Sequence, residues 1–320
     1  MTYRFVDLRL ETELQEWNTA EEPVRGSREK MTLIRPDDAA YFIFKLPKDR
    51  REHQIWSELV ASFIAGDLLG WEVQHVQIGV LNGRPGSLLA YVYEPGSKRG
   101  EQEVFFEGED LCAEVMPTFD RRRGDDHTLG ILEKVYEKIL GPCDGMARAD
   151  FLDFWARAIA FDTLISNTDR HAENWAVIRS TAATRMAPLY DNATSMGCNM
   201  EARGLLRQFR ADGAINDAKL ASFAQSGCHH LRARGSATKG TQFEELCGAF
   251  LALYPEGRCW FEAIAEIDLE PVSELLARIA DIKCLDEPYA LCDERRMHIM
   301  AILHIGRERI KNVLQLGQTR

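Results

Sequence analysis

Alternating apolar and polar positions are concentrated in the first third of the chain. The runs TLI (residues 32–34) and YFIFKL (residues 41–46) flank the turn-like PDDA, and Gly83 with Pro85 and Gly86 separates VQIGVL from SLLAYVY. Such runs, punctuated by turn residues, are typical of strands joined in hairpins. A helical pattern at residues 53–69 interrupts them. Residues 31–93 are therefore predicted to fold as two strands, a helix and two further strands.

The rest of the chain has the periodicity of helices. Residues 131–140 and 149–165 carry apolar positions at helical spacing, and WAVIR with the residues before APLYD reads as a small hairpin. Short helical stretches dominate from residue 214 onward, ending in a helix near residues 294–314. PGSKRG at residues 95–100 is a predicted break. The pattern predicts a strand-rich part, residues 1–95, and a mainly helical part, residues 96–320.

Composition narrows the class of protein. With 320 residues, 45% of them hydrophobic, the chain can bury a large core as one two-lobed unit or two domains. No segment approaches the ~18 uninterrupted apolar residues of a membrane span, and the first residues lack the order of a signal peptide. The eight cysteines include no CxxC pair, which excludes a zinc framework and favours a reduced cytoplasm.

The net charge of −11 argues against general nucleic-acid binding, which needs a basic footprint. It also disfavours adsorption to anionic membranes. Two local basic groups remain: Arg121 to Arg123, and His229 and His230 with Arg232 and Arg234. Both are interpreted as solvated loops.

The most informative segment is FDTLISNTDRHAEN, residues 161–174, followed by APLYD, residues 187–191. It places Asp169, then Asn174 five positions on, then Asp191, in the order and spacing of a protein-kinase site. The chemistry needs a carboxylate to orient a hydroxyl, and an amide oxygen with a second carboxylate to hold Mg²⁺. A solvated loop is the alternative, because D-x-x-x-x-N is common by chance. The strand beginning at Trp175 and the second aspartate favour the phosphoryl-transfer site.

Lys45 is the matching candidate in the strand-rich part. It lies in an apolar strand, where an ammonium group needs partners, and Glu58 follows thirteen residues later, near the start of the predicted helix. An edge-strand lysine facing water is the alternative. Tyr190 is interpreted as a packing residue that positions Asp191, and Asp162 as an exposed helix residue rather than a supporting carboxylate.

NTDRHAEN followed by APLYD resembles the bacterial HipA-type Ser/Thr protein kinases, and the D-R-H-x-x-N core is also similar to phosphatidylinositol 3/4-kinases. The resemblance spans residues 25–197. GSREK resembles the family's short glycine loop, in which Gly26 and Ser27 would offer backbone N–H groups to phosphate. The strand with Lys45 resembles the ATP-lysine strand, and Glu58 matches the acidic partner of that lysine.

The resemblance implies a bilobal α+β protein-kinase-like fold that uses ATP and Mg²⁺. It implies that Asp169 orients the acceptor hydroxyl, His171 organises the loop, and Asn174 and Asp191 hold the metal. The backbone of Tyr91, Val92 and Tyr93 would meet the adenine. The implied partners are a protein substrate, such as one from the translation apparatus, and a helix-turn-helix antitoxin if the chain is a toxin.

Two features distinguish this chain from full-length members of the family. Only about 25 residues precede Gly26, so the extra N-terminal subdomain is expected to be missing or reduced. Some members inactivate themselves by phosphorylating a serine just before the glycine loop. Residues 21–25 contain no serine, so this device is not expected here, although Thr19 and Ser27 are other acceptors.

Two alternative functions stay open on the sequence. A phosphoinositide or small-molecule kinase would use the same catalytic set. A non-catalytic nucleotide-binding module is the other alternative. The presence of Lys45, Asp169, Asn174 and Asp191 together argues against that module, because such modules usually arise by loss of one of them.

Overall fold

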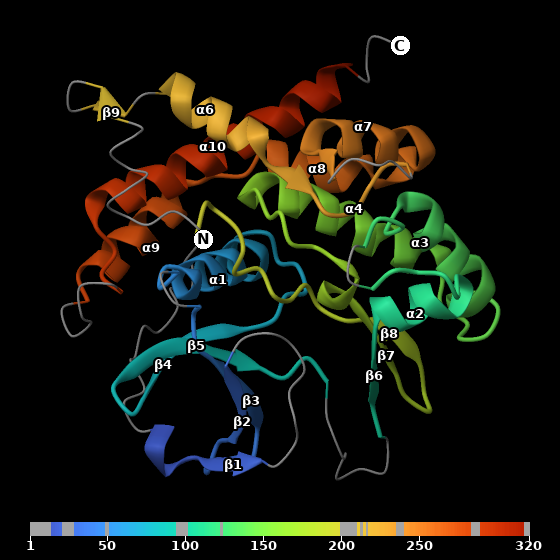
Figure 1. Cartoon of the computed structure of the whole chain (residues 1–320), viewed down its shortest axis with the longest axis horizontal. Coiled ribbons are helices and arrows are strands. Elements are labelled where there is room, and N and C mark those ends of the chain that lie inside the picture. The colour runs from blue at the N-terminus through green and yellow to red at the C-terminus, as the bar shows by residue number, and fades with distance from the viewer. Residues whose placement is uncertain are drawn as a thin grey trace. The chain divides into compact units, whose positions relative to one another are not determined.

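The computed structural model describes residues 14–20, 29–48, 51–93, 102–121, 124–198, 210–211, 214–215, 217–234, 240–282 and 289–316. Contacts divide the chain into two compact units. Figure 1 labels the helices and strands of the chain. The first unit comprises Met1–Val92, Asp191–Leu220 and Asp268–Ala301, and the second comprises Tyr93–Tyr190, Ala221–Ile267 and Ile302–Arg320. Both units are discontinuous in sequence, and the division into lobes at residue 95 stays a prediction.

The first unit contains an antiparallel sheet in the order β1-β2-β3-β5-β4. Its strands are β1 (Asn18–Ala20), β2 (Lys30–Ile34), β3 (Tyr41–Lys45), β4 (Val76–Leu81) and β5 (Arg84–Ala90). Alternation in β3 sends Phe42 and Phe44 into a core with Leu33 and Leu88. The predicted strands and the β4–β5 hairpin are confirmed. At the end of β3, the register pairs Lys45 with Lys30 on one side and Ser87 on the other.

Helix α1 (Gln54–Ser62) packs against β4 and β5 and continues as a π-helical segment, Phe63–Leu68. All of its residues are buried, which explains why its apolar positions are not confined to one stripe. Trp56 anchors it by donating from Nε1 to the carbonyl of Tyr289 at 2.7 Å. The first unit also contains α9 (Glu270–Ala280) and the first turns of α10 (Asp293–Leu316).

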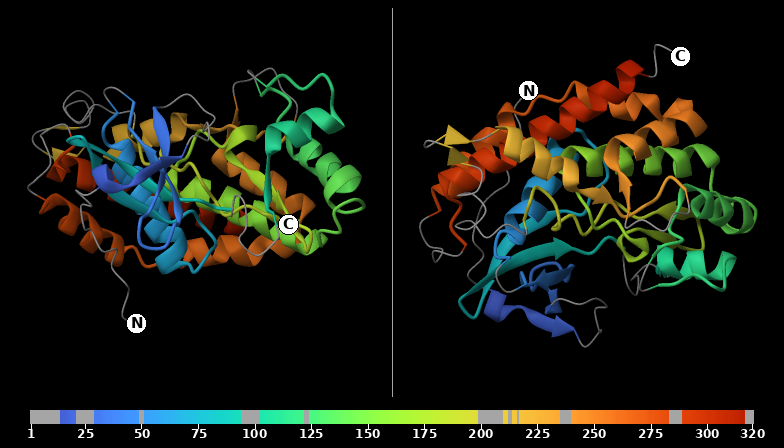
Figure 2. Two further views of the ribbon diagram at one scale, coloured as in Figure 1. Left: turned by 90° about the horizontal axis from the view of Figure 1, so that it is seen from below. Right: turned by 45° about the horizontal axis from the view of Figure 1, so that its top comes forward.

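The second unit is mainly helical and is built around α4 (Arg148–Ile165), which packs against α7 (Phe243–Leu253) and α8 (Arg258–Ala265) (Figure 2). Its three-stranded antiparallel sheet has the order β6-β7-β8. The predicted WAVIR hairpin is therefore confirmed as β7 and β8. The remaining elements of this unit are β6 (Val104–Glu107), α2 (Gly108–Val115), α3 (Leu129–Val135) with the π-helical segment Tyr136–Leu140, β7 (Ala176–Arg179), β8 (Thr184–Met186), β11 (Cys228–His229) and β12 (Thr241–Gln242).

Several short elements complete the described chain. Three are 3₁₀ turns: Leu14–Glu16, Ala172–Asn174 and Pro255–Gly257. A small antiparallel pair joins β9 (Arg210–Ala211) to β10 (Ala214–Ile215), and α6 (Asp217–Ser226) follows it. Helices dominate beyond residue 214, as the sequence predicts.

Helix α10 approaches the end of α4 closely at Gly306. A Cβ atom added to Gly306 would lie 2.2 Å from the carbonyl oxygen of Leu164. Only glycine therefore allows the two backbones this spacing. Leu164 is near the end of the helix that leads into the Asp169 loop, so this contact helps to fix where that loop begins.

No helix in the described part of the chain is long and apolar enough to cross a membrane. The architecture is a strand-rich sheet near the N-terminus followed by a mainly helical region, which confirms the α+β fold class expected from the sequence.

Candidate active site

The first unit brings Lys45 together with two carboxylates, the nearby Glu58 and Asp191, which is 146 positions away in the sequence. Lys45 Nζ lies 2.7 Å from Asp191 Oδ1 and 3.7 Å from Glu58 Oε2. Lys45 is only 6% exposed and Glu58 2% exposed. Burying an ammonium group costs free energy unless ionised partners surround it, so these carboxylates stabilise the lysine in place. The water-facing alternative for Lys45 is wrong.

Local structure explains how the three side chains meet. Lys45 is the last residue of β3, and Glu58 lies in the middle of α1, which packs on the same sheet. Asp191 has a backbone φ of 51°, in the left-handed region that aspartate tolerates better than most residues. Unusual backbone conformations of this kind cluster at functional sites.

The second unit positions the loop that contains Asp169. Helix α4 ends at Ile165, and the next residue, Ser166, has a φ of 50° that turns the chain out of the helix. Asn167 then accepts a hydrogen bond from the backbone N–H of Asp169 at 3.1 Å. The Asp169 side chain remains 41% exposed, which leaves its carboxylate accessible to a substrate.

Asn174 is fixed in one orientation by the same loop. Its amide nitrogen donates to the backbone carbonyl of Asp169 at 2.6 Å, which assigns Oδ1 as the other terminal atom of the amide. Magnesium prefers oxygen ligands, and in nucleotide enzymes it is held by one or two side chains plus phosphate oxygens. Asn174 and Asp191 are therefore each of a residue type that can supply an oxygen ligand to Mg²⁺.

His171 contacts the loop around it rather than acting alone. Its Nδ1 accepts from the N–H of Glu173 at 3.3 Å, and its Nε2 lies 3.3 Å from the Asn174 amide nitrogen. These contacts support the organising role implied by the resemblance.

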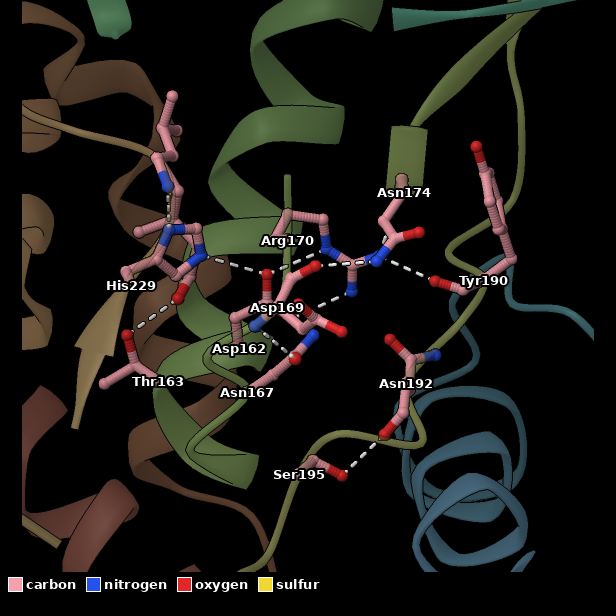
Figure 3. Close-up of polar contacts among 12 residues, drawn as sticks. Asp162, Thr163, Asn167, Asp169, Arg170, Asn174, Tyr190, Asn192, Ser195 and His229 are labelled. Carbon is pink, nitrogen blue, oxygen red and sulfur yellow. Dashed lines mark hydrogen bonds and ion pairs between the residues drawn. The ribbon is translucent and has the colours of Figure 1, made fainter. Parts of the chain in front are cut away.

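Arg170 makes several of the polar contacts drawn in Figure 3, and its side chain is completely buried. Its Nε and Nη2 donate to the two oxygens of Asp162 at 2.9 and 2.8 Å. Its Nη1 donates to the backbone carbonyls of Asn174 at 2.8 Å and Tyr190 at 2.7 Å. One guanidinium group thus connects the residue predicted to hold the metal with the residue immediately before Asp191.

Asp162 is fully buried, so the expectation of an exposed helix residue is wrong. Burial by itself would raise the pKa of Asp162, but the charge of Arg170 and the hydrogen bonds from His229 and Arg170 more than offset it and lower the pKa to about 2. Asn167 also donates to Asp162, at 2.8 Å. Asp162 is therefore ionised, and it holds the loop through its hydrogen bonds with Asn167 and Arg170.

The solvated-loop interpretation is also wrong for His229 and Arg232, whereas Arg234 is exposed, as that interpretation expects. His229 is completely buried and lies 3.0 Å from Asp162, while Arg232 is 4% exposed and pairs with Asp125 at 2.6 Å. Both side chains have their polar partners inside the protein, which a local sequence pattern cannot show. The other basic group differs, because Arg121 is partly exposed and pairs with Glu109 and Asp110.

Tyr190 packs as predicted. Its ring lies 5.8 Å from that of Phe105, and its hydroxyl donates to the carbonyl of Glu173 at 2.7 Å. The predicted adenine segment follows β5: Tyr91 contacts Thr32 through its hydroxyl at 2.9 Å, and Tyr93 stacks on Phe105 at 5.2 Å. Gly26 and Ser27 of the predicted glycine loop lie outside the described residues.

Three functional candidates were missed or undervalued in the sequence: Asp162, Arg170 and His229. Arg170 lies inside the recognised motif, and its place next to Asp169 was the signal that could have marked it as a candidate. His229 lies 67 positions from Asp162, and no local pattern links the two.

The fold and these side chains define a protein-kinase-like architecture. Comparison with family models then gives the family, because the HipA-like C-terminal domain matches residues 23–247, most of the chain. The chain therefore belongs to the HipA-like family. Comparison with curated protein sequences returned no match.

Two solved structures show the same fold. The proinflammatory kinase CtkA of Helicobacter pylori aligns with a TM-score of 0.65 at 14% identity, over 96% of this chain and 99% of that chain. The toxin–antitoxin complex of HipA, HipB and operator DNA from Shewanella oneidensis MR-1 contains a chain that aligns with a TM-score of 0.51 at 13% identity, over 92% of this chain and 65% of that one. At these identities the likeness concerns the fold.

Proposed function

We propose that this chain is an ATP- and Mg²⁺-dependent protein kinase that phosphorylates serine or threonine hydroxyls. The observation that carries the proposal is the buried Lys45, which lies between Glu58 and Asp191 although Asp191 is 146 positions away in the sequence. A buried lysine with these two carboxylates is the phosphate-binding arrangement of protein kinases. Family membership and the similarity to CtkA support the same activity.

In the proposed reaction the acceptor hydroxyl oxygen attacks the γ-phosphorus of ATP. The bond between that phosphorus and the β–γ bridging oxygen breaks, and ADP leaves with the electron pair. Asp169 orients the hydroxyl and takes its proton. Lys45, held by Glu58, contacts the phosphates, while Asn174 and Asp191 hold Mg²⁺. Backbone groups of Tyr91, Val92 and Tyr93 would meet the adenine, and those of Gly26 and Ser27 the phosphates.

The acceptor class is tested by incubating the purified protein with γ-labelled ATP and a cell extract, then separating protein from lipid and small-molecule products. We expect label on protein serine or threonine, absent with Asp169→Asn. Label only in the lipid or small-molecule fraction would replace the protein-kinase proposal by the phosphoinositide or small-molecule alternative. Nucleotide binding without any transfer would favour the non-catalytic module.

A toxin role with a helix-turn-helix antitoxin is part of the proposal, supported by the fold shared with the HipA chain that was crystallised with HipB and operator DNA. Expression of the chain should then arrest growth and Asp169→Asn should not. The gene neighbourhood should also encode a small helix-turn-helix protein whose co-expression relieves the arrest. Growth unaffected by the active protein would contradict the toxin role and leave the kinase activity intact.

A further inference from the structure

Asp162 is the point where three parts of the second unit meet. Its Oδ1 accepts from Asn167 Nδ2 and Arg170 Nη2, both at 2.8 Å, and its Oδ2 accepts from Arg170 Nε at 2.9 Å and lies 3.0 Å from His229 Nε2 (Figure 3). With two such contacts on each oxygen, the carboxylate is held in a single orientation. The orientation of the Arg170 fork follows from that of the carboxylate, because the pair is bidentate.

Asp162, Asn167, Arg170 and His229 form this cluster. The first three lie within residues 161–174, and His229 comes from a distant part of the sequence. It comes from β11, its side chain is 0% exposed, and its ring meets Phe243 edge-on at 5.8 Å. Its Nδ1 accepts from the N–H of Leu231 at 3.0 Å, so the ring proton is assigned to Nε2. His229 therefore donates to Asp162 rather than accepting from it.

Two chains of hydrogen bonds connect Asp162, and therefore His229, to the predicted catalytic residues. Through Arg170, Asp162 sets the carbonyl of Asn174 and the carbonyl of Tyr190, which is covalently followed by Asp191. Through Asn167, it sets the backbone N–H of Asp169. Three predicted active-site residues thus depend on one buried carboxylate.

The neighbouring His230 contacts the loop that contains Asp169. Its ring meets that of His171 edge-on, with centroids 5.6 Å apart. Burial, and after it the proximity of His171, lowers the pKa of His230 to about 4, so it is a neutral packing group at pH 7. Two consecutive residues therefore contact different parts of this region: His229 contacts Asp162 on α4, and His230 contacts His171 in the loop.

We propose that His229 is a positioning residue for phosphoryl transfer, which acts through Asp162 and Arg170 to hold Asp169, Asn174 and the backbone before Asp191 in place. It touches neither nucleotide nor acceptor. The kinetic part of this inference rests on the proposed kinase function. Misplacement of reacting groups by about 1 Å can cost ~10²-fold in rate, so loss of one orienting bond is expected to be visible.

The test uses two substitutions at the same position. His229→Leu removes the donor and keeps an apolar side chain of moderate size, while His229→Gln places an amide N–H where Nε2–H was. Thr163→Val is the matched control: Thr163 neighbours Asp162 on α4 and is buried, but it bonds to the Ile159 carbonyl and to Cys247 rather than to the cluster.

The first measurement is amide hydrogen exchange of peptides covering residues 166–175, in the full chain without nucleotide. We expect faster exchange in His229→Leu, near wild-type exchange in His229→Gln, and no change in Thr163→Val. The second measurement is transfer from labelled ATP. We expect kcat about 10–100-fold lower and a raised Mg²⁺ requirement for His229→Leu, with both largely restored in His229→Gln.

Unchanged exchange and unchanged kcat in a folded His229→Leu variant would overturn the inference, and so would a His229→Gln variant as impaired as His229→Leu. If His229→Leu does not accumulate as folded protein, His229→Asn, whose amide is too short to reach Asp162, takes its place. A wild-type protein with no transfer activity would instead contradict the proposed function, and the exchange comparison would then decide the positioning role alone.

Discussion

At the scale of single residues, the proposed function gives Asp191 two partners, Lys45 and Mg²⁺. In the structure its Oδ1 is 2.7 Å from Lys45 Nζ, while Glu58 is a full ångström farther from the same ammonium group. Binding of Mg-ATP would give Lys45 phosphate oxygens as partners and leave the Asp191 carboxylate to the metal. Glu58 then remains to hold the lysine.

We predict that Asp191→Ala weakens Mg²⁺-dependent ATP binding at least about tenfold, because it removes a charged ligand that bridges metal to phosphate. Isothermal calorimetry with Mg-ATP measures this directly. Asp38→Ala is the control, since Asp38 is an exposed turn residue paired with Arg35. Unchanged affinity in Asp191→Ala would mean that APLYD is a structural turn.

Asp169→Asn should affect the other step. Asn has nearly the same size but is a poor base, so ATP binding should be retained while transfer falls by ~10²–10⁴-fold. Single-turnover transfer from labelled ATP, read beside calorimetry on the same sample, separates the two effects. Near wild-type turnover would refute the assignment of the catalytic loop.

At the scale of elements, the packing of α10 on α4 depends on one missing side chain. Gly306→Ala would force a methyl group to within 2.2 Å of the Leu164 carbonyl, so one of the two helices must move. We expect a loss of about 1–3 kcal/mol in the free energy of unfolding, typical of overpacking.

Gly248 in α7 provides the matched control for Gly306. An added Cβ at Gly248 meets nothing within 4 Å. Gly248→Ala should therefore stabilise by about 0.5–1 kcal/mol through helix propensity alone. Urea unfolding of both variants gives the comparison, and a Gly306→Ala variant as stable as wild type would show that the α4–α10 contact yields easily.

Most elements could be predicted because their signals are local. The β3 strand is set by alternation of Phe42 and Phe44 with Tyr41 and Ile43, and the β4–β5 hairpin by its turn residues. The order of Lys45, Glu58, Asp169, Asn174 and Asp191 was likewise visible, because motif spacing is local too. The contact of Lys45 with Asp191 could not be predicted, because it depends on how the chain folds in three dimensions.

What the sequence did not reveal are charges neutralised at long range. In the sequence, Asp162 looks like a polar residue of an ordinary amphipathic helix. Only the structure shows its contacts with Arg170 and His229. The exposed or buried state of a charged residue depends on partners, and a partner 67 positions away leaves no local signal. The same reason explains the error over Arg232, whose partner Asp125 lies far upstream.

At the scale of the whole molecule, buried histidines make stability depend on pH. Burial, and then the nearby charge of Arg295, lowers the pKa of His53 to about 4 and that of His298 to about 3. Burial also lowers the pKa of His127 well below its ordinary value. All three are neutral in the folded chain at pH 7, whereas in the unfolded chain they take up protons near pH 6.5.

The unfolded state therefore binds more protons than the folded state between pH ~6.5 and ~4, so stability should fall as the pH is lowered through that window. Each such group contributes up to about 1.4 kcal/mol per pH unit there. Urea midpoints at pH 7.5, 6 and 5 measure the effect. His53→Gln with His298→Gln should flatten the profile, and equal midpoints at all three pH values in the wild type would contradict the prediction.

The four hydrogen-bonding contacts at Asp162 also bear on how relatives of this chain should be compared. A homologue could retain every residue that meets ATP or metal and still lose activity through a change at position 229. Searches that score short motifs would classify it as an active kinase. Because the histidine and the aspartate satisfy each other in a buried site, we expect them to be inherited or replaced as a pair during evolution.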